Sequence, residues 1–513
     1  MRVGPDDPGA FFAPVRTKQL LYSAKGCAPL VFWATLVAFV LTYGWMVWAG
    51  NRAFMRIPRD TDAVLFHEFL KHVVNGELPL VRQPITGKLV HYFLADHFVP
   101  GLLLVLPIWV LWPGNVMFSW TLVATYAACS ALVFDIARHR LNSPGWASLI
   151  GVAFLLSPRP GWSLYNHLND DPFLPLFFLL AYRALVRDQA GWYWAAIVGL
   201  LISREDAGLF AIPIGLLAWL GHGRRMIGAT TIVLSVTYMA VVLWVVLPHL
   251  PGGGGEFLHF RTGYGWLGNS PSEALRTLLS NPITVLQRIH EMGGTWGTFM
   301  HLAPFAFLSL ASWQGLIVLI PLSYLLLHGH SVALAYQYAY RAAAIAAPSA
   351  IEGVRQLRTN LFSRFPSAER VLGAIMLALV LGLHVWVGYS PLSRHFNWDE
   401  FRSGPRERAM RKAMALIPPR SRVSASRVYF THLVPLHEVD CIWEHVEVRG
   451  GPDSLGVWCV DTDRPVQSEY LLLTDEDPDS PTFRRVAEGG LYAPIFSRYG
   501  TTLFHRVDRR LAQ

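Results

Sequence analysis

The sequence predicts a mainly α-helical, polytopic membrane protein with about eleven spans and a small extracytoplasmic α/β domain at its C-terminal end. Of its 513 residues, 53% are hydrophobic and only 15% are charged, whereas soluble domains usually carry about 25% charged residues. The charges are also uneven, because residues 393–513 hold 34 of the 78 Lys, Arg, Asp and Glu side chains. We therefore predict a transmembrane domain over residues 1–392 and a soluble α/β domain over residues 393–513.

The composition excludes two other classes of protein. The 19 Trp, 29 Phe and 18 Tyr residues are more aromatic side chains than a disordered chain carries. The net charge of +8 needs no nucleic-acid partner, because Lys and Arg collect in the cytoplasmic loops of membrane proteins.

Apolar runs set the predicted spans, since a transmembrane helix needs about 20 apolar residues and about 17 can suffice. The four clearest runs are residues 29–49, 115–137, 226–247 and 368–389. Seven shorter runs lie at residues 145–157, 171–187, 191–203, 205–220, 296–312, 314–327 and 333–351. The run from Phe98 to Trp112 contains Pro100 and Pro107, so we predict a juxtamembrane or re-entrant helix there instead of a span.

Basic residues orient these spans. With the N-terminus in the cytoplasm, eleven spans place every short basic connection on the cytoplasmic side, as the positive-inside rule requires. These connections contain Arg138, Arg140, Arg183, Arg187, Arg224, Arg225, Arg355, Arg358, Arg364 and Arg370. The long loops 50–114 and 248–295 and the C-terminal domain are then extracytoplasmic, and loops of such length usually carry function.

The four cysteines form no metal-binding motif. Cys27 and Cys129 fall in or beside apolar runs, where a small buried side chain is the simplest interpretation. Cys441 and Cys459 lie 18 residues apart in the C-terminal domain. If that domain is extracytoplasmic they are a candidate disulfide, and we leave this open against two free thiols.

The first long external loop concentrates acidic and histidine side chains. It carries Asp60, Asp62, His67, Glu68, Asp96 and His97. A carboxylate here could act as a general base or bind a divalent cation such as Mg²⁺ or Mn²⁺, and histidine could assist either role. The alternative interpretation is a set of solvated loop charges.

The second external segment lies before the run at 171–187. His167 is a candidate contact for a sugar or a phosphate. Asp170 and Asp171 stand directly before Pro172, and acidic residues followed by proline are typical of a helix N-terminus. We therefore expect Asp171 to cap the following helix.

Arg204, Glu205 and Asp206 interrupt two apolar runs. Three charges near the hydrocarbon edge are costly unless they pair with each other or line a wet cavity. Two interpretations stay open. One is a substrate-binding cluster, and the other is a solvated hairpin in which Arg204 pairs with one of the two carboxylates.

Two further positions combine aromatic and polar side chains on the external side. Arg261, with Tyr264 and Trp266 close behind it, suits bidentate recognition of a phosphate, while the aromatic rings suit a sugar face or the membrane interface. Tyr338 begins a late span, where it either faces the bundle interior or anchors the interface.

The order of these segments resembles a family of predicted bacterial membrane proteins catalogued as a domain of unknown function, which is itself similar to the GT-C superfamily of multi-spanning glycosyltransferases. The resemblance covers most of residues 50–500. It rests on Asp62 followed by Gly76, DHFVP at 96–100, RED at 204–206, RTGYGWLGNSP at 261–271, QY at 337–338, IPPRSRVSAS at 417–426 and EYLLLTDED at 469–477. One departure is His67, which stands where the family has a second acidic residue five positions after Asp62.

The resemblance implies a GT-C-like fold in the bacterial cytoplasmic membrane, a polyprenyl-phosphate sugar donor, and a cell-envelope glycan, lipid or protein acceptor. In that class a base deprotonates the acceptor hydroxyl, and cationic groups or a metal ion meet the charge on the leaving phosphate. We expect Asp62 to be the base and Arg204 and Arg261 to contact the phosphate. His97 would orient the loop or bind a cation together with Asp62, and Glu205 would line the substrate site. One direct displacement would invert the sugar carbon.

Two other functional classes remain as alternatives. A lipid or solute transporter would place ionisable residues at the membrane midplane on broken helices, often within an internal repeat, and the sequence has no convincing repeat. A non-catalytic scaffold or sensor would use the C-terminal domain for recognition and would tolerate substitution of Asp62.

Overall fold

The computed structural model describes most of the chain. The described residues are 27–54, 62–77, 80–82, 89–91, 97–166, 171–249, 263–329, 331, 333–336, 338–433, 435–441, 468–474 and 490–507. The side chains at 62–65 are not among them.

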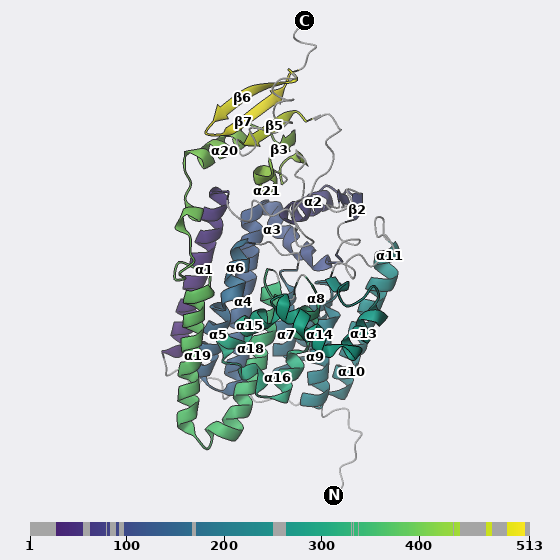
Figure 1. Cartoon of the computed structure of the whole chain (residues 1–513), viewed down its shortest axis with the longest axis vertical. Coiled ribbons are helices and arrows are strands. Elements are labelled where there is room, and N and C mark those ends of the chain that lie inside the picture. The colour runs from purple at the N-terminus through teal and green to yellow at the C-terminus, as the bar shows by residue number, and fades with distance from the viewer. Residues whose placement is uncertain are drawn as a thin grey trace.

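A bundle of helices forms the body of the protein, and a small sheet stands at one end of it (Figure 1). Within the described ranges, four helical stretches are long and apolar enough to cross a membrane. They are α1 (Ala28–Arg52), α4 (Asn115–Leu141), the continuous α10–η7–α11 (Arg225–His249) and α19 (Pro366–Val387). They coincide with the four clearest apolar runs, and the predicted mainly helical fold is confirmed. The total of eleven spans stays a prediction.

Shorter helices complete the structure, and most of their apolar faces share one large core with the long helices. The helices within residues 271–291 pack instead in a separate small cluster with Leu267, Ala274 and Val285. The shorter helices are α2 (Asp62–Val74), η5 (Pro100–Val105), α3 (Leu106–Leu111), α5 (Pro144–Leu155), α6 (Pro158–Asn166), α7 (Leu174–Val186), α8 (Ala190–Leu201), α9 (Gly208–Leu216), η6 (Leu217–Gly221), α13 (Pro271–Ser280), α14 (Pro282–Glu291), α15 (Gly294–Leu302), η8 (Ala303–Phe305), η9 (Leu308–Leu310), α16 (Trp313–Val318), α17 (Ile320–Leu327), α18 (Tyr338–Leu357) and η10 (Arg358–Phe362).

Local sequence explains several helix starts. α5 begins at Pro144 directly after Ser143, whose Oγ accepts a hydrogen bond from the backbone N–H of Trp146. α13 begins in the same way, at Pro271 after Ser270. Proline at the first helical position loses no helical hydrogen bond, and the serine satisfies one of the amides that the helix leaves free.

The segment Phe98–Trp112 forms a short helix, in which the 3₁₀ turns of η5 run into α3. Its twelve helical residues span about 18 Å at the α-helical rise. This is shorter than the hydrocarbon core of a bilayer, which is about 30 Å thick. Leu102, Val105 and Trp109 are buried, and α3 lies beside α2 below the sheet (Figure 1). This length agrees with the juxtamembrane interpretation.

Glu352 ties three helices together at the opposite end of the bundle. Its fully buried carboxylate accepts two hydrogen bonds of 2.8 Å from Arg140 of α4. It also accepts one of 2.6 Å from the Tyr182 hydroxyl of α7 and one of 2.7 Å from Arg355 of its own helix, α18. A buried carboxylate needs such complete pairing to remain charged.

Other ion pairs join the same helix ends. Asp135 of α4 lies 2.6 Å from both Arg183 and Arg187 at the end of α7. Arg358 lies 2.9 Å from Glu369, which joins the turn between α18 and α19. The basic connections that orient the spans in the sequence therefore gather at one end of the bundle, the end opposite the sheet (Figure 1). Which side of the membrane this end faces stays a prediction.

A five-stranded sheet forms the C-terminal part of the chain, with the order β4-β3-β5-β7-β6. Its strands are β3 (Arg422–Ala425), β4 (Glu438–Cys441), β5 (Tyr470–Thr474), β6 (Tyr492–Arg498) and β7 (Thr501–Arg506), and the accompanying helices are η11 (Trp398–Phe401), α20 (Pro405–Ala415), η12 (Arg427–Tyr429) and α21 (Phe430–Leu433). β3, β4 and β5 are parallel, while β7 pairs antiparallel with β5 and β6. Met410 and Ala413 of α20 pack with Leu472 and Leu503 of the sheet.

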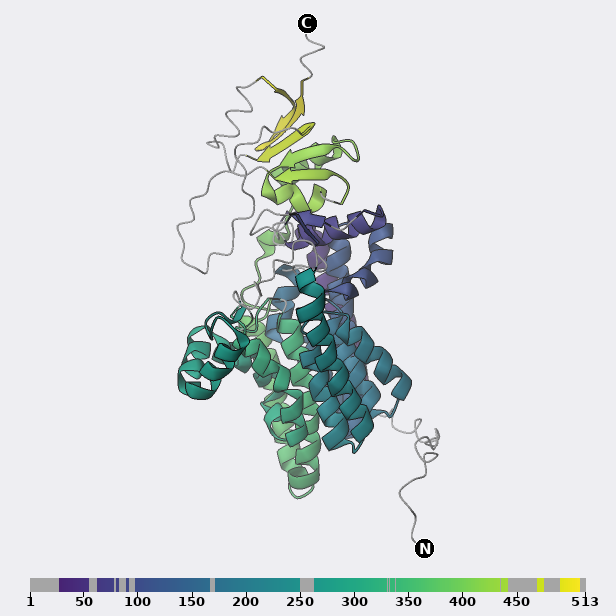
Figure 2. The ribbon, with the colours of Figure 1, turned by 90° about the vertical axis from the view of Figure 1, so that its right-hand side faces the viewer.

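Two smaller features complete the description. β1 (Leu80–Arg82) and β2 (Leu89–His91) form an antiparallel pair near α2. Cys441 is the last residue of β4, and Cys459 lies outside the described residues, so the disulfide stays a prediction. Viewed from the side, the sheet lies beyond one end of the helix bundle along the long axis (Figure 2).

Substitution of Glu352 by Gln is expected to lower stability strongly. The change leaves the guanidinium groups of Arg140 and Arg355 without their carboxylate, and loss of one partner of a buried pair costs about 3–5 kcal/mol. Thermal unfolding of the detergent-solubilised protein measures the effect. Glu291→Gln is the matched control, because Glu291 is 60% exposed and its ion pair among the described residues is with exposed Arg288. Equal unfolding temperatures for the two variants would contradict the structural role of Glu352.

Candidate functional site

The turn between α8 and α9 brings three successive charges into the protein interior. Arg204 is buried, and the side chains of Glu205 and Asp206 are 14% and 13% exposed. Arg204 Nε lies 3.2 Å from Glu205 Oε1 and 3.6 Å from Asp206 Oδ1. Arg204 thus pairs with both neighbouring carboxylates, but the turn is packed inside the protein and is not solvated. Its role toward a substrate stays a prediction.

Glu205 fixes the start of the η5–α3 segment. Its Oε2 accepts a 3.0 Å hydrogen bond from the backbone N–H of Phe98, and its Oε1 lies 3.0 Å from His97 Nδ1. The backbone N–H of Gly101 donates to the carbonyl oxygen of Ile202 at 2.7 Å. The guanidinium of Arg204 and the hydrogen bond from the Phe98 N–H compensate the burial of the Glu205 carboxylate.

Arg204 and Glu205 both contact the ring of His97. Arg204 Nη2 lies 3.0 Å from His97 Nδ1 and 3.3 Å from Nε2. A guanidinium only donates hydrogen bonds and a carboxylate only accepts them. The hydrogen bond between His97 and Glu205 is therefore donated by the imidazole.

Asp206 continues the network toward α18. Its Oδ2 accepts a 2.8 Å hydrogen bond from the Tyr324 hydroxyl and lies 3.5 Å from Arg341 Nη1. Arg341 is fully buried in the first turn of α18, and its Nη2 lies 2.5 Å from Asp171 Oδ2. The sequence-based expectation that Asp171 caps a helix is wrong, because α7 begins at Leu174 with Phe173 in the cap position. The carboxylate pairs with Arg341 instead.

Negative and positive charges alternate along this network of side chains. We call the seven residues Asp171, Arg341, Asp206, Tyr324, Arg204, Glu205 and His97 the Arg204 cluster. Its three carboxylates and two guanidinium groups nearly balance, so each charge faces an opposite charge within 3.6 Å. Such pairing of opposite charges favours one arrangement of the side chains before any ligand arrives.

Two predicted aromatic residues border the Arg204 cluster. The ring of Tyr264 lies 6.1 Å from that of Tyr324 and 5.1 Å from that of His328. The ring of Tyr338 lies 6.0 Å from His328 and 5.2 Å from the guanidinium carbon of Arg341. The structure thus brings His97, Arg204, Glu205, Tyr264 and Tyr338 into one region, and their roles toward a substrate stay predictions.

The remaining predicted site residues fall outside this description. Asp62 is the first residue of α2, but its side chain is not described. His167, Arg261 and Asp96 lie outside the described residues. Their predicted roles are therefore neither supported nor contradicted by the geometry.

α2 itself is held firmly on the bundle. His67 is fully buried, with Nδ1 accepting a 2.9 Å hydrogen bond from the Trp109 indole and Nε2 3.0 Å from Asn115 Oδ1. Phe69 and Leu70 are buried beside it. Burial lowers the pKa of His67 to about 4 and outweighs the Asn115 hydrogen bond. His67 is therefore a packing residue.

The described residues do not suit a metal ion. No group of three His, Cys, Asp or Glu residues within these ranges is arranged to hold one. His97 has one ring nitrogen directed at Glu205, and the cationic guanidinium of Arg204 lies 3.0 Å away. A positive charge at that distance disfavours a second cation.

Sequence reasoning missed Arg341 and Tyr324. Arg341 is a charge within the predicted span 333–351, and an ionisable residue inside a span is itself a signal of a functional or paired site. Tyr324 carries no such signal, because tyrosines near span ends commonly anchor the interface. Its contact with Asp206 depends on the packing of α17 against α9.

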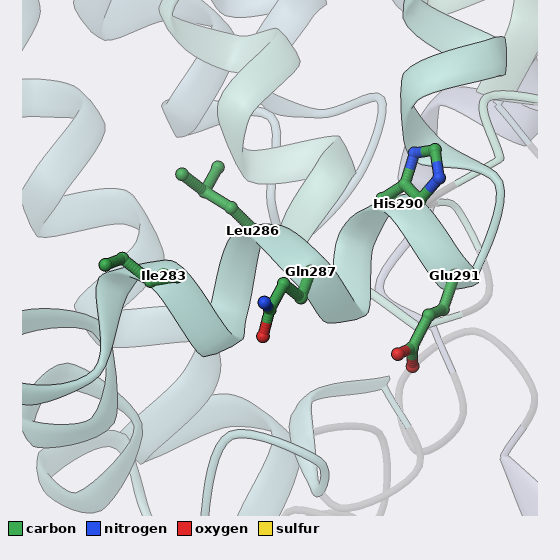
Figure 3. Close-up of a pocket in the computed structure, with 5 residues that line it drawn as sticks. All are labelled: Ile283, Leu286, Gln287, His290 and Glu291. Atoms are coloured by element: carbon green, nitrogen blue, oxygen red, sulfur yellow. The ribbon is translucent and has the colours of Figure 1, made fainter.

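Shallow hollows on the surface lie elsewhere, on the amphipathic helices α13 and α14. One is lined by Ile283, Leu286, Gln287, His290 and Glu291 (Figure 3). A second is lined by Ser272, Leu275, Arg276, Leu279 and Ser280. Neither contains a residue of the Arg204 cluster, so they contribute nothing to its chemistry.

Comparison with known proteins gives a family and a fold. A family model described as predicted membrane protein (DUF2079) matches residues 61–477. The search of curated protein sequences gives no match. Among solved structures, the chain is similar to ArnT from Cupriavidus metallidurans bound to undecaprenyl phosphate, with a TM-score of 0.50 and 13% identity over 93% of this chain and 98% of that one.

A second structure, of ArnT from the same organism in the apo state, matches with a TM-score of 0.38 and 14% identity over 93% of this chain and 97% of that one. A TM-score of 0.38 is too low to establish a shared fold. The first comparison establishes a GT-C fold of the ArnT type, as the sequence predicted.

The buried imidazole of His67 is expected to make stability depend on pH. Between pH 6.5 and about 4 the unfolded chain binds a proton at His67 that the folded protein does not bind. The free energy of unfolding therefore falls as the pH falls through this window, by roughly 3 kcal/mol. Thermal unfolding between pH 7 and pH 4.5 measures the loss.

His67→Gln keeps a donor and an acceptor but binds no proton, so its loss of stability over this window should be smaller than that of the wild type. His290→Gln removes an exposed imidazole and serves as the control. An identical pH dependence in the wild type and His67→Gln would contradict the assignment.

Proposed function

The chain belongs to the DUF2079 family of predicted membrane proteins, and from this premise we propose that it is a membrane glycosyltransferase. It transfers a sugar from a polyprenyl-phosphate donor to an acceptor on the extracytoplasmic side. Asp62 acts as the general base, and the C-terminal domain lies on the same side as the reaction.

The fold supports this proposal. The chain shares the GT-C fold with ArnT, a protein crystallised with undecaprenyl phosphate. A polyprenyl carrier has its tail in the bilayer and its reactive sugar carbon at the interface. An enzyme for such a donor needs a membrane body that ends in a polar, preorganised site. The Arg204 cluster is a polar site of this kind.

One observation carries the assignment of Asp62. A continuous set of contacts connects the Arg204 cluster to α2, the helix that begins at Asp62. Glu205 holds the backbone N–H of Phe98, the η5–α3 segment follows, and Trp109 of α3 donates to His67 of α2. Asp62 lies five residues before His67, little more than one helical turn away. A base on a helix anchored in this way is held in place before the reaction.

The proposed reaction is a single displacement. The Asp62 carboxylate removes the proton of the acceptor hydroxyl while the oxygen forms a bond to the anomeric carbon. The bond between that carbon and the phosphate oxygen breaks, and polyprenyl phosphate leaves with the bonding electrons. The configuration at the sugar carbon inverts, and general-base assistance contributes about 10²–10⁴-fold to the rate.

Of the two candidate partners of the leaving phosphate, Arg204 is among the described residues and Arg261 is not. Arg204 already contacts Glu205, Asp206 and His97, so it reaches a phosphate only by exchanging one of these partners. Its main task is to hold the cluster together. We therefore propose Arg261 as the first contact of the leaving phosphate and Arg204 as a secondary one.

The distribution of charge along α18 favours an enzyme over a transporter. Arg341 near its start and Glu352 near its end each belong to a separate network. Between them, residues 342–351 are Ala, Ile, Pro and Ser without an ionisable side chain. A transporter carries ionisable residues at the membrane midplane, and this helix has none there.

Asp62→Asn is expected to reduce sugar transfer by two to four orders of magnitude. The amide has nearly the shape of the carboxylate but accepts no proton, and the expected loss is about 10²–10⁴-fold. Transfer from a polyprenyl-phosphate sugar by the purified protein is the measurement. Glu77→Gln is the control, because Glu77 is exposed at the end of α2 and contacts His72 alone among the described contacts. Full activity of Asp62→Asn would remove this residue from the mechanism.

Transfer is also expected to persist after chelation of divalent cations. The residues around His97 do not suit a cation, because Arg204 supplies the positive charge there. The assay is repeated after dialysis against a chelator, and Mg²⁺ or Mn²⁺ is then added back. Loss of activity that either ion restores would place a metal in the site and overturn this expectation.

A further inference from the structure

We propose that the C-terminal domain clamps α2 against the bundle and thereby positions the N-terminal end of that helix. The inference rests on the proposed function for the role of Asp62, and the clamp itself stands on contacts between described residues. Three sets of contacts join the domain to the end of α1 and to α2.

The first contact is an aromatic side chain inserted from the bundle into the domain. Phe54 lies two residues after the end of α1, is 2% exposed and belongs to the hydrophobic core of the C-terminal domain. Its ring lies 6.1 Å from Tyr429 and 4.5 Å from His432. Phe54 has a φ of 54°, in the left-handed region, which costs a non-glycine residue roughly 1–2 kcal/mol. The burial of the ring offsets this strain.

The second contact is polar and involves the last turn of α1. The backbone oxygen of Arg52 accepts hydrogen bonds from Arg411 of α20 and from the Ser403 hydroxyl. Arg411 also donates to Ser403 Oγ at 2.8 Å. These bonds satisfy a carbonyl that the helix end leaves free, so α1 and α20 keep a fixed relation.

The third contact reaches α2 itself. Lys71 Nζ donates a 3.0 Å hydrogen bond to the backbone oxygen of His437. α21 of the domain also packs against α2. Hydrogen bonds from a charged donor are among the stronger ones in proteins, and this bond joins segments that are 366 residues apart in the sequence.

These contacts hold α2 from two sides. On the bundle side, His67 is bonded to Trp109 and Asn115. On the domain side, Lys71 is bonded one helical turn further along. With both bonds present the helix axis is fixed. Without Lys71 the helix pivots about His67, and its first residue, Asp62, moves in the opposite direction.

Even a small movement of Asp62 would matter for catalysis. A displacement of about 1 Å at a reacting group reduces a rate by about 10²-fold. The C-terminal domain therefore acts on the reaction through α2 without touching the substrate, and Lys71 is a positioning residue.

The test compares Lys71→Met with Lys412→Met and Lys71→Arg in the full-length protein. Lys412 is an exposed lysine of α20 for which no contact is described, so its variant removes the same charge without the bond. Arginine at position 71 keeps a cationic donor for the carbonyl of His437. Hydrogen exchange of the amides in residues 66–76 measures the clamp without reference to activity, and sugar transfer measures its consequence.

Lys71→Met is expected to accelerate amide exchange in α2 roughly tenfold. It should lower kcat by about 10- to 100-fold with little change in KM. Lys412→Met should match the wild type, and Lys71→Arg should restore most of both properties. Unchanged exchange in Lys71→Met would overturn the clamp. Faster exchange with full transfer would overturn the positioning role. Absence of transfer by the wild type would contradict the proposed function alone, and the exchange result would still decide the clamp.

Discussion

Charged side chains inside an apolar bundle require partners, and this requirement organises the protein at both ends of α18. Near one end, Arg341 is fully buried between Asp171 and Asp206. Near the other, Glu352 is fully buried among two arginines and a tyrosine. Unpaired, each of these charges would cost several kcal/mol in such surroundings. Their pairing therefore fixes how the helices that carry them pack.

The two networks serve different purposes. The Glu352 network joins the ends of α4, α7 and α18 through short ion pairs and hydrogen bonds, and we assign it a structural role. The Arg204 cluster borders aromatic rings and continues, through Glu205 and Trp109, to α2. α2 in turn contacts the C-terminal domain through Lys71. We thus assign the chemistry to the part of the protein where α2 lies between the helix bundle and the C-terminal domain (Figure 1).

The sequence predicts the features that depend on composition and order. The long spans follow from apolar length, and the GT-C fold follows from the order of short segments around Asp62 and Arg204. Contacts between distant segments do not follow. Asp171 carries a sequence signal for a helix cap, but its carboxylate pairs with Arg341, because a buried guanidinium competes more strongly for it than free amides do. Phe54 is an ordinary residue after a helix, and only the tertiary packing places it in another domain.

The central claim is that this chain transfers a sugar and does not move the lipid-linked sugar intact across the membrane. The most direct measurement follows a labelled polyprenyl-phosphate sugar incubated with the purified protein in vesicles and an envelope extract as acceptor. The account predicts free polyprenyl phosphate in equal amount to the labelled acceptor, with the sugar configuration inverted. Label that remains on the lipid, whether stationary or carried to the opposite leaflet, would contradict it.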